Sequence, residues 1–426
     1  METKPMHQNA RLSPRARLSD EALLDLVQRQ TLDYFLQFGH PQSGMARERS
    51  NPDPRYDYLQ TVSTGGTGFG IMAMLVGVAR GLATHDAVLR QVERIVDFLS
   101  LAECYHGVFP HFLNGTTGRA IEFSEKDDGG DLVETSFLMM GLLCARQFFE
   151  AADAREKDLR QAIDRLWHKV EWNWHTNGRD TLYWHWSPRH GWEMDHAIRG
   201  WNECLITYVL AASSPTHPIE PSVYHQGWAN SATFRNGHDY YGVTLPLGPT
   251  CGGPLFFSHF SFLGLDPRGL KDRYADYWEQ NRAHTLINRA YCIKNPSAFG
   301  GYGPQCWGLT ACDGDAGYGA FCPNHDRGVI APTAALSAMP YTPAESMAVL
   351  RHLYEELGDK VWRRFGFVDG FNISRGWVAE SHLAIDQGPI VVMIENFRSG
   401  LLWKHFMSCP EVVAGLSRLG FTSPAI

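Results

Sequence analysis

The chain has 426 residues, of which 44% are hydrophobic and 20% charged, a composition typical of a folded globular protein with a large core. Its formal net charge is −8 and no stripe of Lys and Arg runs through it, which argues against a nucleic acid or an anionic membrane as its partner. No apolar run reaches the roughly 18 residues that a transmembrane helix needs.

The start of the chain differs in composition from the remainder. Residues 1–19 contain Pro and basic residues but no apolar segment of a signal peptide, so we expect a flexible tail and, for the sequence as written, a cytoplasmic protein. A periplasmic location stays open if the sequence is a processed form. No linker divides the rest, which predicts a single domain over residues 20–426, and we expect a monomer. Nine scattered cysteines disfavour a disulfide framework.

Apolar residues recur at helical spacing along most of the chain, which predicts a mainly helical protein. Ser19 before the first segment and Pro389 within the last are typical helix-start signals. Aromatic residues around a Pro-containing turn predict a short β-hairpin near residues 180–195. The predicted helical segments are 20–38, 65–82, 85–101, 131–151, 156–173, 196–212, 272–293, 329–339, 343–357 and 389–407.

Two kinds of helical segment alternate along the chain. Segments such as 65–82 and 131–151 join a polar, Gly-rich start to a body that is apolar on all sides, whereas 85–101 and 156–173 are amphipathic. An alternation of apolar inner and amphipathic outer helices, repeated about six times, predicts an all-α fold, an (α/α)6 barrel with short β-hairpins inserted in its loops. A helical solenoid is the structural alternative, but no repeat of fixed period supports it.

The loops before the apolar helices are rich in aromatic residues and glycine, and a barrel would gather them at one mouth. Aromatic faces beside carboxylates, amides and histidines suit a sugar, which has an apolar C–H face and a rim of hydroxyl groups. For any single aromatic residue a place in the core is the competing interpretation. The predicted substrate-binding residues are His111, Asn114, Trp201, His259, Trp307, Asp313 and Tyr318.

Glu203 stands within an apolar segment that reads as a buried helix. Burial disfavours the charged form of a carboxyl group, so we expect a raised pKa, which suits a general acid at neutral pH. The alternative is a structural glutamate that is paired with a backbone group or an arginine.

Three acidic residues, Asp127, Asp131 and Glu134, cluster at the start of the segment 131–151. We expect Asp131 to cap this helix and Glu134 to complete an acidic capping box. Capping alone would explain both residues, yet carboxylates crowded at a helix mouth also suit sugar hydroxyls and catalytic water.

Asp386 lies three residues before Pro389, so we expect it at or just outside a helix N-terminus, where the helix dipole should lower its pKa. Glycoside hydrolysis needs one protonated carboxyl group as acid and one ionised carboxylate as base. A raised pKa at Glu203 and a lowered pKa at Asp386 would suit these two roles. Glu395, with Arg398 three residues later, is more simply explained as an ion pair.

Other chemistries fit the sequence less well. Motifs of metalloproteases, serine hydrolases and P-loop enzymes are missing from it, so we expect neither a cofactor nor a metal. Cys306, Cys312 and Cys322 share a loop with His325, but no nucleophile setting is visible. A sugar epimerase would use histidine bases, and a glycan-binding protein without activity would lack an acid or a base; both are weaker alternatives.

Six stretches together resemble glycoside hydrolase family 144, whose bacterial members act on β-1,2-glucans and are related to the glycoamylase-like domain of cyclic β-1,2-glucan synthases. The resemblance runs from about residue 20 to 420. The stretches are STGGTGFG, GVFPHFLNGTTG, DLVETSFLMMGLL, GWNECLITYVLAASSPTHPI, GGPLFFSHFSFLGLDP and AIDQGPIVVMIENFRSGLLW.

This resemblance implies an (α/α)6 barrel and a metal-independent, inverting hydrolysis of β-1,2-glucosidic bonds, with a β-1,2-linked glucan or sophorooligosaccharide as substrate. It maps the family's acidic positions onto Asp127, Asp131, Glu134, Glu203 and Asp386, with Glu203 favoured as acid and Asp386 as base, a water or substrate hydroxyl relaying the proton. Internal (endo) cleavage is the leading expectation. Exo release of sophorose, or glycosyl transfer, is the alternative.

Overall fold

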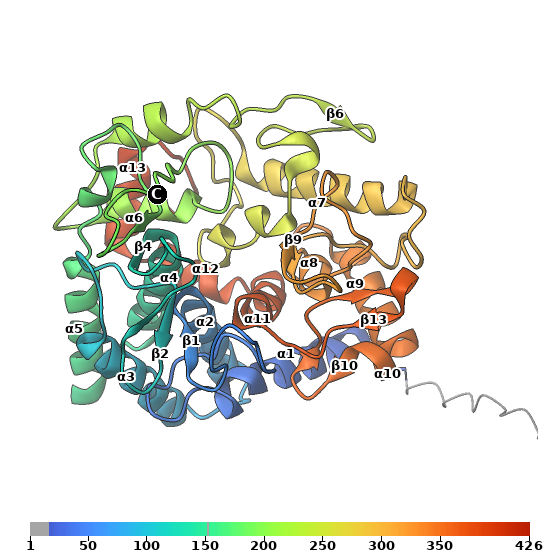
Figure 1. The fold of residues 1–426 in the computed structure, drawn as a ribbon, viewed down its shortest axis with the longest axis horizontal. Helices are drawn as coiled ribbons and strands as arrows, with labels where there is room; N and C mark the ends of the chain where they lie inside the picture. The colour runs from blue at the N-terminus through green and yellow to red at the C-terminus, as the bar shows by residue number, and fades with distance from the viewer. Residues whose placement is uncertain (1–16, 151–152) are drawn as a thin grey trace, which may run out of the picture.

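The computed structural model describes residues 17–150 and 153–426; most of the predicted tail, residues 1–16, lies outside the described residues. Helices make up most of the regular structure (Figure 1). The α-helices are α1 Asp20–Gln37, α2 Thr64–Ala79, α3 His85–Leu101, α4 Leu132–Phe148, α5 Ala154–Lys169, α6 Leu205–Ser213, α7 Tyr277–Lys294, α8 Pro332–Leu336, α9 Pro343–Arg351, α10 Gly358–Val361, α11 Ala384–Arg398, α12 Leu401–Met407 and α13 Pro410–Arg418.

An inner ring of helices surrounds the centre of the molecule. It consists of α2, α4, α6, α8 and α11, completed by two short 3-10 segments, Leu255–Ser258 and Ser261–Leu263. Almost every residue of α2 and α4 is buried, and all of α6 is, because these helices are apolar on all sides and have neighbours on all sides.

Amphipathic helices form an outer layer around this ring (Figure 1). Helix α3 buries one stripe that includes Val88, Val92 and Ile95, and leaves its polar side in solvent. Helix α1 packs against α11 and α2, α3 and α5 pack together, α13 packs against α6, and α9 packs against α8. Paired inner and outer helices around one ring constitute an (α/α)6 barrel, as the alternation in the sequence predicts.

Several predicted helix boundaries are wrong. The segment predicted from residue 196 becomes helical only at Leu205; residues 196–199 are extended, with a bridge at Ala197, and bends and a turn follow them. The last predicted segment begins five residues early, at Ala384, and is divided into α11 and α12 at Gly400, which has a φ of 70°. Glycine adopts this left-handed conformation readily, so it ends one helix and allows the next to start in a new direction.

The strands are short and, in the described chain, all pair antiparallel. The hairpin predicted near residues 180–195 is present in part, because isolated antiparallel bridges join Tyr183 to Ala197 and Ser187 to Gly191 around the turn that contains Pro188. Between these bridges, β5 (His185–Trp186) pairs with β4 (Gly130–Asp131), which the sequence did not predict. This pairing brings His185 beside the start of α4. The other strands are β1 Thr61–Ser63, β2 Phe112–Asn114, β3 Ala120–Ile121, β6 Asp239–Tyr240, β7 Val243–Thr244, β8 Ala311–Cys312, β9 Gly319–Ala320, β10 Trp362–Arg363, β11 Gly366–Phe367, β12 Phe371–Asn372 and β13 Trp377–Val378.

Helices α2 and α4 touch through their backbones. A Cβ atom at Gly68 would collide with the carbonyl oxygen of Phe137, and a Cβ atom at Gly141 would collide with the carbonyl oxygen of Gly68. Two glycines therefore allow the inner helices to approach more closely than any larger residue would permit. This contact fixes the two helix starts, which carry part of the site, relative to each other.

Two further features bear on the expectations from the sequence. The described helices include none with the length and apolar character needed to cross a bilayer. All nine cysteines are free, and seven of them are buried.

Candidate active site

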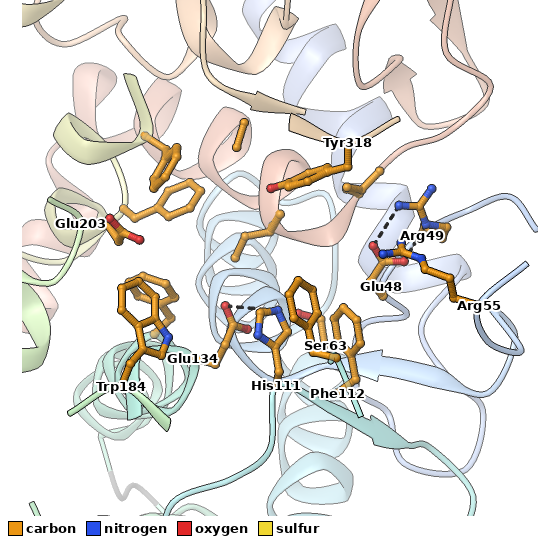
Figure 2. A pocket seen from close by; sticks show the side chains of 17 residues that line it. Glu48, Arg49, Arg55, Ser63, His111, Phe112, Glu134, Trp184, Glu203 and Tyr318 are labelled. Carbon is orange, nitrogen blue, oxygen red and sulfur yellow. Dashed lines mark hydrogen bonds and ion pairs between the residues drawn. The ribbon is translucent and has the colours of Figure 1, made fainter. Parts of the chain in front are cut away.

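A cavity of about 180 Å³ opens where the starts of α2 and α4 meet the turn before α6 (Figure 2). Side chains from segments far apart in the sequence line it, including His111, Glu134, Trp184, Glu203 and Tyr318. Phenylalanine rings cover much of the remaining wall, so the cavity combines apolar faces with a few ionisable groups, as ligand sites commonly do.

His111 is the charged centre of one wall. Its Nδ1 lies 3.0 Å from Oδ2 of Asp131 and 4.0 Å from Oδ2 of Asp127, and its Nε2 lies 4.0 Å from Oε1 of Glu134. Burial opposes a charge on the imidazole, but the three carboxylates together raise the pKa of His111 to about 10. The imidazole is therefore protonated at neutral pH. It also stacks on the ring of Phe123, with the ring centroids 4.2 Å apart.

Asp131 caps α4, as predicted. Its Oδ1 accepts the backbone N–H groups of Val133 at 3.0 Å and Glu134 at 2.9 Å, while Oδ2 faces His111. Burial alone would raise the pKa of Asp131, but His111 and His185 outweigh it and the pKa is lowered. The carboxylate is thus held as an anion that serves the helix start and His111 at the same time.

Glu134 departs from the predicted capping box. Its Oε2 accepts the N–H of Gly65, 2.8 Å away at the start of α2, and the N–H of Asp131 instead donates to the carbonyl oxygen of Phe109. Burial raises the pKa of Glu134 to about 7, with His111 opposing and the neighbouring aspartates adding to the rise. A carboxyl group freed from capping faces the cavity.

Glu203 lies in the turn before α6, not within a helix as predicted. Its pKa is raised to about 7, chiefly by burial, so the raised pKa expected from the sequence is confirmed. The charges of Asp131 and Glu134 add to this rise, and only its own backbone N–H opposes it. Glu203 lines the same cavity as Glu134, and no cation of the described chain is among the groups that shift its pKa.

The lowered pKa predicted for Asp386 is wrong. It is the third residue of α11, only 2% exposed, and burial raises its pKa; the charges of Asp313 and Glu48 add to the rise. Asp386 also shares a hydrogen bond with the carboxyl group of Asp369, whose pKa is raised as well, so the pair retains a proton. The prediction failed because acidic neighbours from distant segments outweigh the helix dipole.

Asp386 does not line the cavity beside Glu203. It lies near Tyr318. Burial raises the pKa of the Tyr318 phenol above its ordinary value, and the charges of Asp386 and Asp369 add to that rise. Tyr318 itself lines the cavity. Any action of Asp386 on a substrate in this cavity therefore requires an intermediary.

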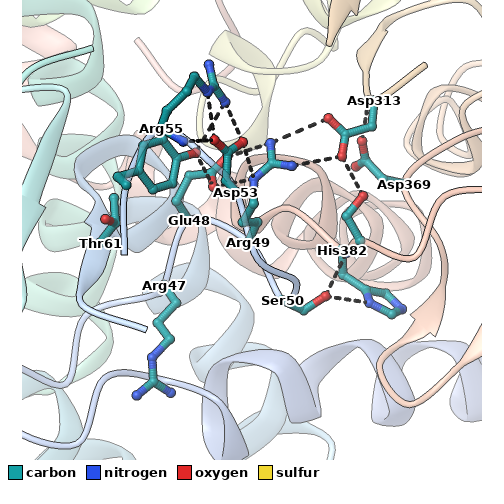
Figure 3. Close-up of polar contacts among 12 residues, drawn as sticks. Arg47, Glu48, Arg49, Ser50, Asp53, Arg55, Thr61, Asp313, Asp369 and His382 are labelled. Atoms are coloured by element: carbon teal, nitrogen blue, oxygen red, sulfur yellow. Dashed lines mark hydrogen bonds and ion pairs between the residues drawn. The ribbon is translucent and has the colours of Figure 1, made fainter. Parts of the chain in front are cut away.

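Sequence reasoning missed an ion-pair network around Arg49 (Figure 3), which lies on the side of the cavity away from Glu203 (Figure 2). Arg49 contacts Glu48 at 2.8 Å, Asp313 at 3.1 Å and Asp53 at 3.6 Å, and the Ser381 hydroxyl donates to Asp313 at 2.5 Å. The alternation of basic and acidic residues over 47–57 was the only available signal, because the partner Asp313 is 264 residues away.

Five predicted substrate-binding residues lie outside the lining of the main cavity, and four of them line neither it nor the adjoining one. Asn114 orders its own turn, since its Oδ1 accepts the N–H groups of Thr116 and Thr117. The side chains of Trp201, His259 and Trp307 are buried, at 3%, 2% and 0% exposure. Asp313 lines an adjoining cavity, whereas His111 and Tyr318 line the main one.

One group of side chains has the spacing of a metal site. Ligand atoms of His111, Asp127 and Asp131 lie within 4.8 Å of one another. The same atoms also satisfy each other as a protonated histidine between two carboxylates, and a metal ion would have to displace that proton.

The comparisons with known proteins agree with this arrangement. A family model described as putative glucoamylase matches residues 195–410. A putative glucoamylase structure from Bacteroides uniformis is 56% identical, with a TM-score of 0.94 over 97% of this chain and 100% of that one. The endo-β-1,2-glucanase from Chitinophaga pinensis, solved with sophorotriose and glucose, is 52% identical, with a TM-score of 0.94 over 96% of this chain and 100% of that one.

A curated relative adds a different mode of cleavage. The exo β-1,2-glucooligosaccharide sophorohydrolase (non-reducing end) of Parabacteroides distasonis is 43% identical over 424 residues, which cover 94% of this chain. The match spans only 58% of the length of that relative. On the full-length matches and the family model, the chain belongs to the glycoamylase-like family of glycoside hydrolases, of the family 144 type.

Proposed function

We propose that the protein hydrolyses β-1,2-linked glucan by an inverting acid and base mechanism. The relatives from Chitinophaga pinensis and Parabacteroides distasonis, whose names state activity on this linkage, support the choice of substrate. The observation that carries the proposal is Glu203, a buried carboxyl group in a cavity lined by aromatic rings, with a pKa raised to about 7.

Glu203 is the proposed general acid. Its anion has acidic neighbours and only its own backbone N–H as a favourable contact, so the protonated form persists near neutral pH. In the reaction the proton of Glu203 passes to the glycosidic oxygen while the bond between that oxygen and the anomeric carbon breaks. A water molecule attacks the anomeric carbon from the opposite face and gives its proton to the base.

Two carboxyl groups compete for the role of base. Glu134 lines the cavity, and although burial raises its pKa to about 7, the Gly65 N–H and protonated His111 both stabilise its anion. Glu203 has no cation of the described chain among the groups that shift its pKa, so we assign the base to Glu134. Asp386, the base expected from the sequence, is the alternative; burial behind the cavity lining and the proton shared with Asp369 mean that it would act through a hydroxyl relay.

Chemical rescue separates these assignments. Turnover of linear β-1,2-glucan should fall by about 10²- to 10⁴-fold in Glu203→Gln and in the variant that lacks the base. Azide replaces the attacking water and needs no base, so it should restore turnover in Glu134→Gln, with formation of a glycosyl azide, and leave Glu203→Gln inactive. Rescue of Asp386→Asn, with no rescue of Glu134→Gln, would transfer the base to Asp386.

Endo cleavage is our proposal for the mode of attack, since the Chitinophaga pinensis relative matches the chain over its full length. Exo release of sophorose is the second candidate, supported by the Parabacteroides distasonis relative. Product lengths from linear β-1,2-glucan over time decide between them. Short oligosaccharides of mixed length at early times indicate endo cleavage, sophorose alone indicates exo cleavage, and products longer than the substrate indicate glycosyl transfer.

A further inference from the structure

The cavity beside Glu203 adjoins a second, larger cavity of about 720 Å³. Arg49, Arg55 and Tyr318 line both, so the two cavities share one boundary. Figure 2 shows these three residues on the side of the first cavity away from Glu203 and Trp184. A ligand that is longer than the first cavity would therefore extend toward the second.

Three segments build the second cavity: the loop that runs from Arg49 to Arg55, the tip of the β8–β9 hairpin, and the residues that follow β12. Trp377, which is partly exposed, and Tyr318, which is 49% exposed, contribute aromatic surface. Polar side chains, among them Asn51 and Ser381, also line the cavity. Aromatic faces interleaved with polar groups are suited to the two kinds of surface that a sugar ring presents.

Acidic groups outnumber the two arginines in the lining of the second cavity, which holds Arg49 and Arg55 with Asp53, Asp313 and Glu380. Arg49 is bound by Glu48, Asp53 and Asp313, and Arg55 contacts Asp53 at 2.8 Å. These arginines are therefore occupied by protein carboxylates and do not form an anion site. The cavity fits a neutral, hydroxyl-rich ligand better than a phosphorylated or acidic one.

Asn51 supplies an unused hydrogen-bond acceptor. Its Oδ1 is buried and has no hydrogen-bond partner within the described chain. A buried amide oxygen without a partner costs about 1–3 kcal/mol in a folded protein, and a ligand hydroxyl group would remove that cost. Asn51 and Trp377 both line the second cavity, and the Oδ1 atom of Asn51 is buried in its wall.

We propose that the second cavity binds glucosyl residues of the glucan chain beyond those that lie beside Glu203, with Trp377 as a stacking face and Asn51 as a hydrogen-bond acceptor. The proposal rests on the proposed function, since it assigns a further part of the same substrate. Trp377 and Asn51 then determine the preference for long chains and take no part in bond cleavage.

The test compares substrate lengths. For the unmodified protein, kcat/KM should rise from the β-1,2-linked trisaccharide to longer oligosaccharides until the second cavity is filled. In Trp377→Ala and in Asn51→Ala, kcat/KM for the trisaccharide should stay near that of the unmodified protein, while the value for long glucan falls about tenfold, the effect of losing about 1.4 kcal/mol of binding. Trp362→Ala is the matched control, because Trp362 is a partly exposed tryptophan in the neighbouring hairpin that lines neither cavity.

Each other outcome overturns the proposal. Equal losses on the trisaccharide and on long glucan would mean a general structural effect, and unchanged kinetics in both variants would mean that no sugar occupies the second cavity. Asn51→Ala keeps the test decisive if Trp377→Ala does not fold. An unmodified protein that cleaves neither substrate would refute the proposed function and this proposal together, whereas cleavage without any dependence on chain length refutes only the second cavity.

Discussion

Replacing Glu203 by Gln should stabilise the protein while it removes activity. The folded protein raises the pKa of Glu203 from the ordinary 4.5 to about 7, so folding holds its proton more tightly than the unfolded chain does. Between these two values the unfolded chain ionises while the folded protein does not, and stability falls as the pH rises. The glutamine side chain of the variant carries no charge at any pH and avoids this cost.

The size of the effect follows from the shift. A rise in pKa from 4.5 to about 7 corresponds to about 3 kcal/mol of unfavourable free energy, fully developed above pH 7. The variant should therefore have a free energy of unfolding larger than that of the unmodified protein by up to about 3 kcal/mol at pH 8, and the difference should vanish below about pH 4.5.

Urea unfolding of both proteins at a series of pH values measures this difference. Glu411→Gln is a control of opposite sign, because Arg146 contacts Glu411 at 2.8 Å and lowers its pKa, so that its loss should destabilise the protein above pH 4.5. A Glu203→Gln variant that is less stable than the unmodified protein at pH 8, or whose advantage does not change with pH, would show that the carboxyl group is not held protonated by burial.

Three further outcomes are expected. Asp131→Asn keeps a good helix cap but loses the charge beside His111, so the melting temperature should fall. An NMR titration should show the pKa of His111 moving down from about 10, and an unchanged pKa would contradict the role assigned to Asp131. Proton NMR during early hydrolysis should show an α-configured first product, and a β-configured one would require a nucleophilic carboxylate. Treatment with EDTA should leave turnover unchanged, and a loss that zinc or calcium restores would make His111, Asp127 and Asp131 a metal site.

The inner helices could be predicted because they carry their own signal. A segment such as α2, apolar on every side, has to be buried on every side, whatever its neighbours are. The boundary before α6 could not be predicted, because the turn that contains Trp201 and Cys204 is as buried as the helix that follows. Hydrophobicity reports burial, and here burial does not distinguish a turn from a helix.

The residues of the site also differ in whether their properties could be predicted from the sequence. Asp131 was predictable as a cap from its position beside an apolar segment, and Glu203 as a group of raised pKa from its apolar surroundings. The pKa of Asp386 depends on Glu48, Asp313 and Asp369, which come from distant parts of the chain, and nothing next to Asp386 in the sequence indicates them. Local properties could be predicted, and properties set by contacts between distant segments could not.

The backbone contact between α2 and α4 restricts where this protein could be redesigned. Gly68 and Gly141 allow α2 and α4 to touch through their backbones, and the starts of these helices carry the Gly65 N–H and the Glu134 carboxyl group. Even one added methyl group at either glycine would push these two groups apart. A redesign that aims at a wider or differently shaped cavity should therefore keep Gly68 and Gly141 unchanged. The hairpins and loops around Tyr318 and Trp377 can change in length and composition without moving the inner helices, and they are the natural region for such libraries.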